Sequence, residues 1–226
     1  MIEIEYVFAR GTILKNEESV DYNRFMPISK YITEDNRFSP PGVEWLYLAS
    51  GYKGDARQKI ESAEKCTVKE CKAKVGDRFG ICHFAISQEF YGKKVVDLTI
   101  ADELTYEEIN SDLEKYGQEV KRKARKIFKH TGLVPYTNKA EFMRVFEKWF
   151  SYTDAKLVSE QLLLPVAVAD KKYMYAPFQS MAKYFESLGY VGIIYSSTVY
   201  PGAKNIVLFD KNMAFAVGDI KEIIIN

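Results

Sequence analysis

Residues 104–128, LTYEEINSDLEKYGQEVKRKARKIF, form the clearest structural pattern in this sequence. Thr105 is a suitable N-cap residue, and the glutamates at 107 and 108 suit the positive end of a helix dipole. Apolar side chains recur at steps of three or four, the spacing of one face of an α-helix, at Ile109, Leu113, Tyr116, Val120, Ala124 and Ile127. The stretch therefore predicts a long amphipathic helix.

Further helices are expected on both sides of this one. A charged segment from about 55 to 74 contains no internal Gly or Pro and predicts a helix that Gly76-Asp77 ends. Three more helices are expected downstream: one opening at Thr137 or Asn138, one over 154–163, and one over 176–188 that Gly189 closes.

Strand-like apolar runs lie toward both ends of the chain. They cover about residues 2–10, 45–49, 79–86, 94–98, 191–195, 205–209, 214–217 and 220–225. Strands at both ends around a helical middle of about 104–165 predict one α+β domain that spans residues 1–226.

The composition excludes several classes of function. The 226 residues carry a formal net charge of +1, which offers no bulk attraction to nucleic acid or to anionic membranes. No apolar run approaches the roughly 20 residues of a membrane span, and the N-terminus lacks the pattern of a signal peptide. Three Cys and two His make neither a disulfide framework nor a metal site. We expect a cytoplasmic protein without a metal.

One basic run, Lys121 to Lys126, allows two interpretations. The run lies in the second half of the long helix, where positive side chains interact favourably with the negative end of the helix dipole. A solvent-exposed helix face that binds nothing therefore explains the run. The competing interpretation is a non-enzymatic module that binds a protein or nucleic acid through this face. The near-zero overall charge favours the solvated face.

Three segments are less ordinary than simple loops. Arg37 precedes the tight turn Pro40-Pro41-Gly42, and Tyr47 then lies within an otherwise apolar strand, where its hydroxyl needs a partner. The second segment runs from Tyr173 to Gln179 and into the helix that Gly189 closes. The third is the stretch 200–209.

Taken together and in order, these segments resemble the RES domain family, which is named for its Arg, Glu and Ser. The resemblance spans nearly the whole chain. It is carried by Phe8-Ala9-Arg10, Arg37 and Gly42, Leu46-Tyr47-Leu48-Ala49, Glu70-Cys71-Lys72 ahead of Gly76-Asp77, Tyr175 with Gln179, Gly192 to Ser197, and Gly202 to Phe209.

The resemblance implies a fold and an activity. RES proteins are toxins of bacterial toxin–antitoxin pairs, with an ADP-ribosyltransferase-like core of mostly antiparallel sheets. Here the core would carry an enlarged helical region at about 104–165. The family is similar to enzymes that break the nicotinamide–ribose bond of NAD+, by hydrolysis or by phosphorolysis with phosphate. Transfer of ADP-ribose to a protein is the alternative. NAD+ would be the substrate rather than a cofactor.

The resemblance also implies partners. An antitoxin protein is expected to cover the NAD+ cleft, and nucleic acid would be met only indirectly, through that antitoxin. No membrane partner is expected.

The resemblance assigns roles to individual residues. Glu70 would favour the positive charge that develops on the ribose, as in glycoside cleavage. Tyr47 and Ser197 would position nicotinamide and ribose. The implied catalytic residues are Glu70, Arg37, Tyr47 and Ser197, and the implied NAD+-binding residues are Arg10, Arg37, Tyr47, Ser197, Asn205 and Gln179, with the two arginines on the pyrophosphate.

Two assignments have rivals. Glu70 lies twenty-three residues after Tyr47, where the family commonly has about a dozen, so residues 51–63 resemble an insertion and Glu64 competes with Glu70. Ser196 and Ser197 are adjacent, and the family's Tyr-x-Ser spacing selects Ser197.

Overall fold

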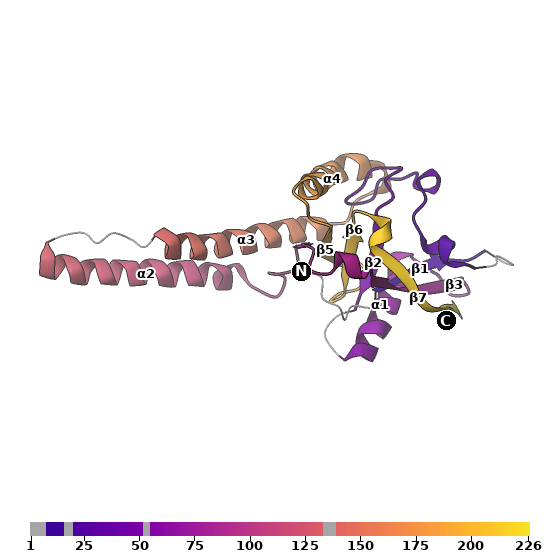
Figure 1. Ribbon diagram of the computed structural model, residues 1–226, viewed down its shortest axis with the longest axis horizontal. Helices are drawn as coiled ribbons and strands as arrows, with labels where there is room; N and C mark the ends of the chain where they lie inside the picture. Colours follow the sequence, from indigo (N-terminus) through magenta and orange to yellow (C-terminus); the bar gives the residue numbers. More distant parts are fainter. Residues whose placement is uncertain (1–7, 16–19, 52–54, 133–138) are drawn as a thin grey trace. The chain divides into compact units, whose positions relative to one another are not determined.

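The computed structural model describes residues 8–15, 20–51, 55–132 and 139–226 (Figure 1). The chain divides into two compact units, Met1–Asp97 with Leu162–Asn226, and Leu98–Gln161. Residues 2–7 of the expected first strand, and the expected helix start at Thr137 or Asn138, lie outside the described residues. The assignment of a single domain remains a prediction.

A seven-stranded sheet forms the centre of the first unit in the described part of the chain, in the order β4-β5-β6-β2-β1-β3-β7. Only the β4–β5 pair is parallel. The mixed fold with a mostly antiparallel sheet confirms the predicted α+β class. The strands are β1 (Phe8–Ile13), β2 (Leu46–Ser50), β3 (Arg78–Ile86), β4 (Val96–Asp97), β5 (Gly192–Ser196), β6 (Lys204–Leu208) and β7 (Ala214–Ile224).

The last strand corrects a prediction. Two strands were expected, over 214–217 and 220–225, but β7 is continuous across both. Gly218 adopts a φ of +66°, and the pairing with β3 shifts register between Ile81 and His83. A bulge of this kind absorbs the turn-like residues without ending the strand.

Two α-helices belong to the first unit. In α1 (Ala56–Glu70), Asp55 and Gln58 form a capping box at the start, and the helix ends four residues earlier than expected. The other, α4 (Lys171–Ser187), begins five residues before the expected start at 176, so Pro177 lies inside the helix and not in its first turn. Short 3₁₀ turns occupy Tyr22–Phe25, Ser29–Tyr31, Gln88–Phe90, Val168–Asp170 and Lys211–Met213.

Close packing brings α1 against the sheet. The side chains of Ala63, Phe79 and Ile81 are buried together on this side. A Cβ on Gly11 of β1 would lie 2.3 Å from the Phe79 ring and 2.8 Å from Thr67 Oγ1, so a side chain there would force α1 away. A second buried cluster includes Phe8, Phe25, Leu46, Leu48, Phe84, Ile206 and Leu208. These contacts fix the C-terminal end of α1 beside β1.

The second unit is built mainly from α2 (Tyr106–Thr131) and α3 (Lys139–Leu163), whose last two residues belong to the first unit. The expected N-cap is confirmed, because Thr105 accepts a hydrogen bond from the Glu108 amide and forms a capping box with that residue. Two helices were predicted where α3 is one. The error has a simple cause, since 139–163 contains no Gly or Pro to end a helix.

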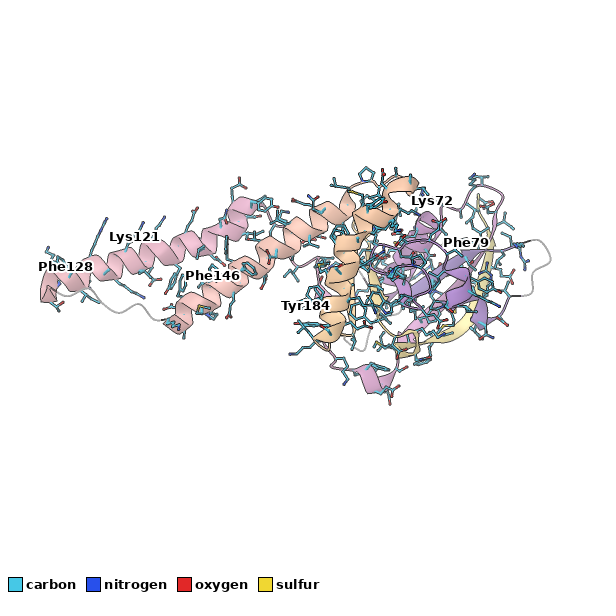
Figure 2. All side chains as sticks on the ribbon, turned by 90° about the horizontal axis from the view of Figure 1, so that it is seen from above. Lys72, Phe79, Lys121, Phe128, Phe146 and Tyr184 are labelled. Atoms are coloured by element: carbon cyan, nitrogen blue, oxygen red, sulfur yellow. The ribbon has the colours of Figure 1, made fainter. Side chains whose placement is uncertain are left out.

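Aromatic side chains join the two helices of this unit. Figure 2 shows the side chains, including Phe146 on α3. The Phe146 ring centroid lies 5.6 Å from that of Trp149, and Trp149 Nε1 donates a 2.7 Å hydrogen bond to Asn110 Oδ1 on α2. The lysines and arginines of the run 121–126 are exposed, as a solvated face requires. No helix in the described ranges combines the length and the apolar character that crossing a membrane demands.

Candidate functional site

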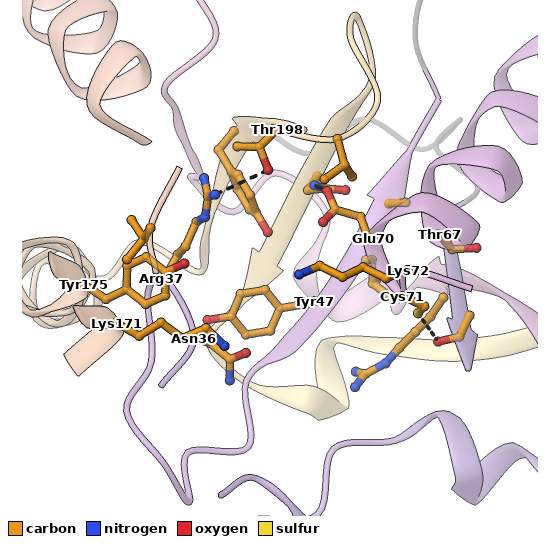
Figure 3. A pocket seen from close by; sticks show the side chains of 18 of the residues that line it. Asn36, Arg37, Tyr47, Thr67, Glu70, Cys71, Lys72, Lys171, Tyr175 and Thr198 are labelled. Carbon is orange, nitrogen blue, oxygen red and sulfur yellow. Dashed lines mark hydrogen bonds between the residues drawn. The ribbon is translucent and has the colours of Figure 1, made fainter. Parts of the chain in front are cut away.

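A cavity of about 680 Å³ lies in the first unit. This volume falls within the range of small-molecule sites, roughly 300–1,000 Å³. Its walls come from β1, β2, the end of α1, residues 35–37, residues 163–171 and the β5–β6 region. Charged and aromatic side chains form part of the lining (Figure 3): Arg10, Asp35, Arg37, Glu70, Lys72, Lys171, Tyr47, Tyr175 and Tyr195.

Glu70 is the last residue of α1 and is held in place by two donors. Its Oε1 accepts 2.8 Å from Ser197 Oγ and 2.7 Å from Asn205 Nδ2. Within the described residues, no hydrogen bond reaches Oε2. A carboxylate at a helix C-terminus is repelled by the partial negative charge of that helix end, so helix stability does not explain the position of Glu70. The arrangement fixes one carboxylate oxygen and leaves the other available to a ligand.

Ser197 acts on the cavity through Glu70. The side chain is buried and is not part of the cavity wall. Besides donating to Glu70, its Oγ accepts hydrogen bonds from the Val199 and Tyr200 amides. Asn205 lines the cavity and also accepts a contact from Cys66 Sγ. The structure therefore shows Ser197 in contact with Glu70 and not with the cavity itself, which is the geometry expected of a positioning residue.

The rival residues lie away from the cavity. Glu64 Oε1 is 3.1 Å from His83 Nε2, and Glu64 Oε2 accepts 2.6 Å from Lys221 Nζ. Ser196 pairs with Lys204 in the β5–β6 ladder and does not line the cavity. His83 has the structural surroundings expected for a lone histidine in a strand. The geometry favours Glu70 and Ser197, whose roles remain predictions.

Arg37 is held at the opposite wall of the cavity. Its Nη1 donates to the backbone oxygen of Leu162, its Nη2 donates 3.3 Å to Thr198 Oγ1, and its Cζ lies 6.0 Å from the Tyr175 ring centroid. Gln179 does not line the cavity. Instead, its Nε2 donates to Asp35 Oδ1 and to the Asn36 backbone oxygen, both at 3.0 Å, and so fixes the segment that precedes Arg37.

Arg10 is a cation that forms no ion pair with the described residues. Its Nη1 is buried and has no hydrogen-bond partner among the described residues, although the side chain lines the cavity. Burial lowers the pKa of the Arg10 guanidinium to about 10. The group nevertheless remains charged at neutral pH, so this wall presents an uncompensated positive charge. Such a charge is suited to an anionic ligand.

The neutral groups of the site keep their protons. Tyr47 OH lies 2.9 Å from Ser39 Oγ, which supplies the expected hydroxyl partner, and burial raises the pKa of Tyr47. Burial also raises the pKa of the Cys71 thiol to about 11, so a thiolate nucleophile is not available at neutral pH. No group of three or more His, Cys, Asp or Glu in the described ranges is arranged to hold a metal ion.

The comparisons with known proteins bear on this geometry. A family model described as the RES domain matches residues 118–223. This part of the chain is similar to RES domains. The resemblance inferred from the loops is thereby confirmed. No curated protein and no solved structure matches the chain. RES domains are associated with toxin–antitoxin systems and with NAD-related enzymatic activity.

The matched range covers only part of the site. Gln179, Ser197 and Asn205 fall within it, whereas Arg10, Arg37, Tyr47 and Glu70 precede it. The structure brings the two groups together, because Ser197 and Asn205 both hold Glu70.

Two lysines of the cavity were not predicted. Lys171 lies near the start of α4 and forms a 2.7 Å ion pair with Glu34, a contact that no sequence motif indicates. Lys72 lies two residues after Glu70, inside a stretch that carried the resemblance, but no role was assigned to it.

A serine substitution tests the positioning role. Ser197→Ala removes one of two donors to Glu70 Oε1, so for the NAD+ cleavage that the resemblance implies we expect kcat to fall about tenfold with KM nearly unchanged. The measurement is steady-state release of nicotinamide.

Ser196→Ala is the matched control and should leave both constants unchanged. In a Glu70→Gln background, Ser197→Ala should cause little further loss, since both changes affect one group. A rise in KM at unchanged kcat would contradict the positioning role.

Proposed function

We propose that this protein cleaves the nicotinamide–ribose bond of NAD+. The observation that carries the proposal is Glu70, a cavity carboxylate with one oxygen fixed by Ser197 and Asn205 and the other unbonded among the described residues. The remaining charged lining is mostly cationic, which suits the diphosphate of a dinucleotide. Tyr47 and Tyr175 supply aromatic surface for a flat ring.

The main requirement of the reaction is a carboxylate beside the ribose. The C1′–N bond breaks and its electron pair stays on the nicotinamide nitrogen, which leaves as a neutral molecule. Positive charge develops on the ribose, and a carboxylate beside it stabilises the transition state more than the ground state. Water or phosphate then forms the new C1′–O bond. With water, the released proton passes to solvent and the product is ADP-ribose.

The proposed loss of NAD+ gives a reason to expect an antitoxin partner. A NAD-depleting enzyme harms the cell that makes it, so an antitoxin protein that covers the cavity belongs to the proposal, as does action in the cytoplasm. Transfer of ADP-ribose to a protein would use the same donor site and differ only in the acceptor.

The test is NAD+ turnover by the purified protein, in buffers with and without phosphate. We expect nicotinamide to appear in equal amount with ADP-ribose, or with its 1″-phosphate when phosphate is the acceptor. Radiolabelled NAD+ with cell extract detects transfer to protein. If no buffer gives nicotinamide and no protein becomes labelled, the proposal is wrong.

A further inference from the structure

Lys72 has an unusual backbone conformation. Its φ of 52° makes it the one non-glycine residue in the described ranges with a positive φ. It closes α1 in a Schellman motif, in which the Lys72 amide donates to Lys69 O at 3.0 Å and the Ala73 amide donates to Val68 O at 3.2 Å. Glycine is the usual residue at this position, because the left-handed conformation is unfavourable for a residue with a Cβ.

Other helices of this protein follow the usual pattern. The residue that ends α2 is Gly132, with a φ of 70°, and Gly189 follows α4 with a φ of 81°. At α1 the chain instead keeps a lysine, although glycine would relieve the backbone. A residue held in strain beside a cavity indicates that its side chain is used.

The Lys72 side chain is exposed and lines the cavity. Figure 3 shows it extending into the cavity, in that view between Glu70 and Tyr47. Among the described residues it has no hydrogen bond and no ion pair, whereas Arg37 and Lys171 are both bound by protein groups. Lys72 is therefore a cavity cation free to move onto a ligand.

A second cation lies on the neighbouring element. Cys71 Sγ contacts the Gly11 backbone oxygen at 3.3 Å, which joins the residue before Lys72 to the residue after Arg10. Arg10 has a buried Nη1 without a partner in the described ranges. A fixed cation and a mobile cation thus come from adjacent positions of β1 and α1. An anion bound by both cations would supply the partner that Arg10 Nη1 lacks.

We propose that Lys72, together with Arg10, binds the diphosphate of the dinucleotide, a role that rests on the proposed function. The flexible lysine folds onto the diphosphate after the substrate has entered. The nicotinamide ribose carries the diphosphate through its 5′ carbon, so a cation two residues from Glu70 is placed to reach it. Lys72 therefore contributes to substrate affinity rather than to bond cleavage.

The experiment compares two ligands by isothermal titration calorimetry. ADP-ribose carries the diphosphate, and nicotinamide riboside lacks it. We expect Lys72→Ala and Lys72→Gly to weaken ADP-ribose binding about tenfold and to leave riboside binding unchanged. Lys72→Arg should retain most of the ADP-ribose affinity. Lys69→Ala, an exposed lysine of the same helix end, is the matched control and should match the wild type.

Thermal unfolding separates this role from a structural one. Lys72→Gly should raise Tm, because glycine adopts the left-handed conformation without strain. Higher stability with weaker ADP-ribose binding excludes misfolding as the cause. If Lys72→Ala binds ADP-ribose as the wild type does, or loses the riboside equally, the role of Lys72 is overturned while the proposed function stands. If the wild type binds neither ADP-ribose nor NAD+, the proposed function itself fails.

Discussion

Glu70→Gln is expected to lower kcat for NAD+ cleavage about a thousandfold while ADP-ribose binding stays nearly unchanged. Glutamine has the same shape, and its side-chain oxygen still accepts from Ser197 and Asn205, whose bonds to Glu70 now measure 2.8 and 2.7 Å. It lacks the negative charge that stabilises the developing positive charge on the ribose. Loss of one well-placed electrostatic contact to a transition state typically reduces kcat by about 10²–10³-fold.

Glu64→Gln is the control for this substitution. Glu64 contacts His83 and Lys221 away from the cavity, so its replacement should leave kcat and KM unchanged. Nicotinamide release under saturating NAD+ measures kcat, and calorimetry with ADP-ribose measures binding. Full activity of the Glu70 variant, or loss of activity in the Glu64 variant, would show that Glu70 is not the catalytic carboxylate.

Arg10→Met is expected to change stability and binding in opposite directions. Without ligand, the buried Nη1 of Arg10 has no partner among the described residues, so methionine of similar length should stabilise the free protein by about 1–2 kcal/mol. This corresponds to a rise in Tm of about 2–8 °C for a chain of this size. ADP-ribose affinity should fall about a hundredfold, because the diphosphate loses a charge-assisted donor.

Arg57→Met supplies the comparison for Arg10→Met. Arg57 is exposed on α1 and pairs with Glu61 at 3.0 Å, so neither Tm nor affinity should change measurably. Differential scanning calorimetry without ligand and titration with ADP-ribose give the two quantities. A lower Tm with unchanged affinity would mean that Arg10 serves the fold and not the ligand.

Local signals in the sequence were sufficient for much of the fold. The capping box at Thr105 and the apolar spacing after it depend only on neighbouring residues, and α2 begins where they predict. The boundaries at β7 and α3 could not be obtained in this way. A bulge that pairs with β3 carries β7 past Gly218, and the strand partner that permits this is distant in the sequence.

The same distinction applies to the site. Arg10, Arg37, Tyr47 and Glu70 were identified by resemblance, and the structure places all four around one cavity. Their contacts could not be predicted, since the donor from Ser197 depends on how two distant elements pack. Lys72 was overlooked for a physical reason. Its proposed role rests on a backbone angle and on a side chain without a partner among the described residues, and neither feature can be obtained from residue order.

The two hydrogen bonds to Glu70 can form only late in synthesis of the chain. Ser197 and Asn205 follow Glu70 by 127 and 135 residues along the chain. A ribosome adding about 5–20 residues per second needs several seconds or more to cover that span. Until β5 and β6 emerge and pair, the nascent chain carries its carboxylate without either donor. The site proposed for NAD+ cleavage is thus completed late in synthesis, when the proposed antitoxin would meet a finished chain.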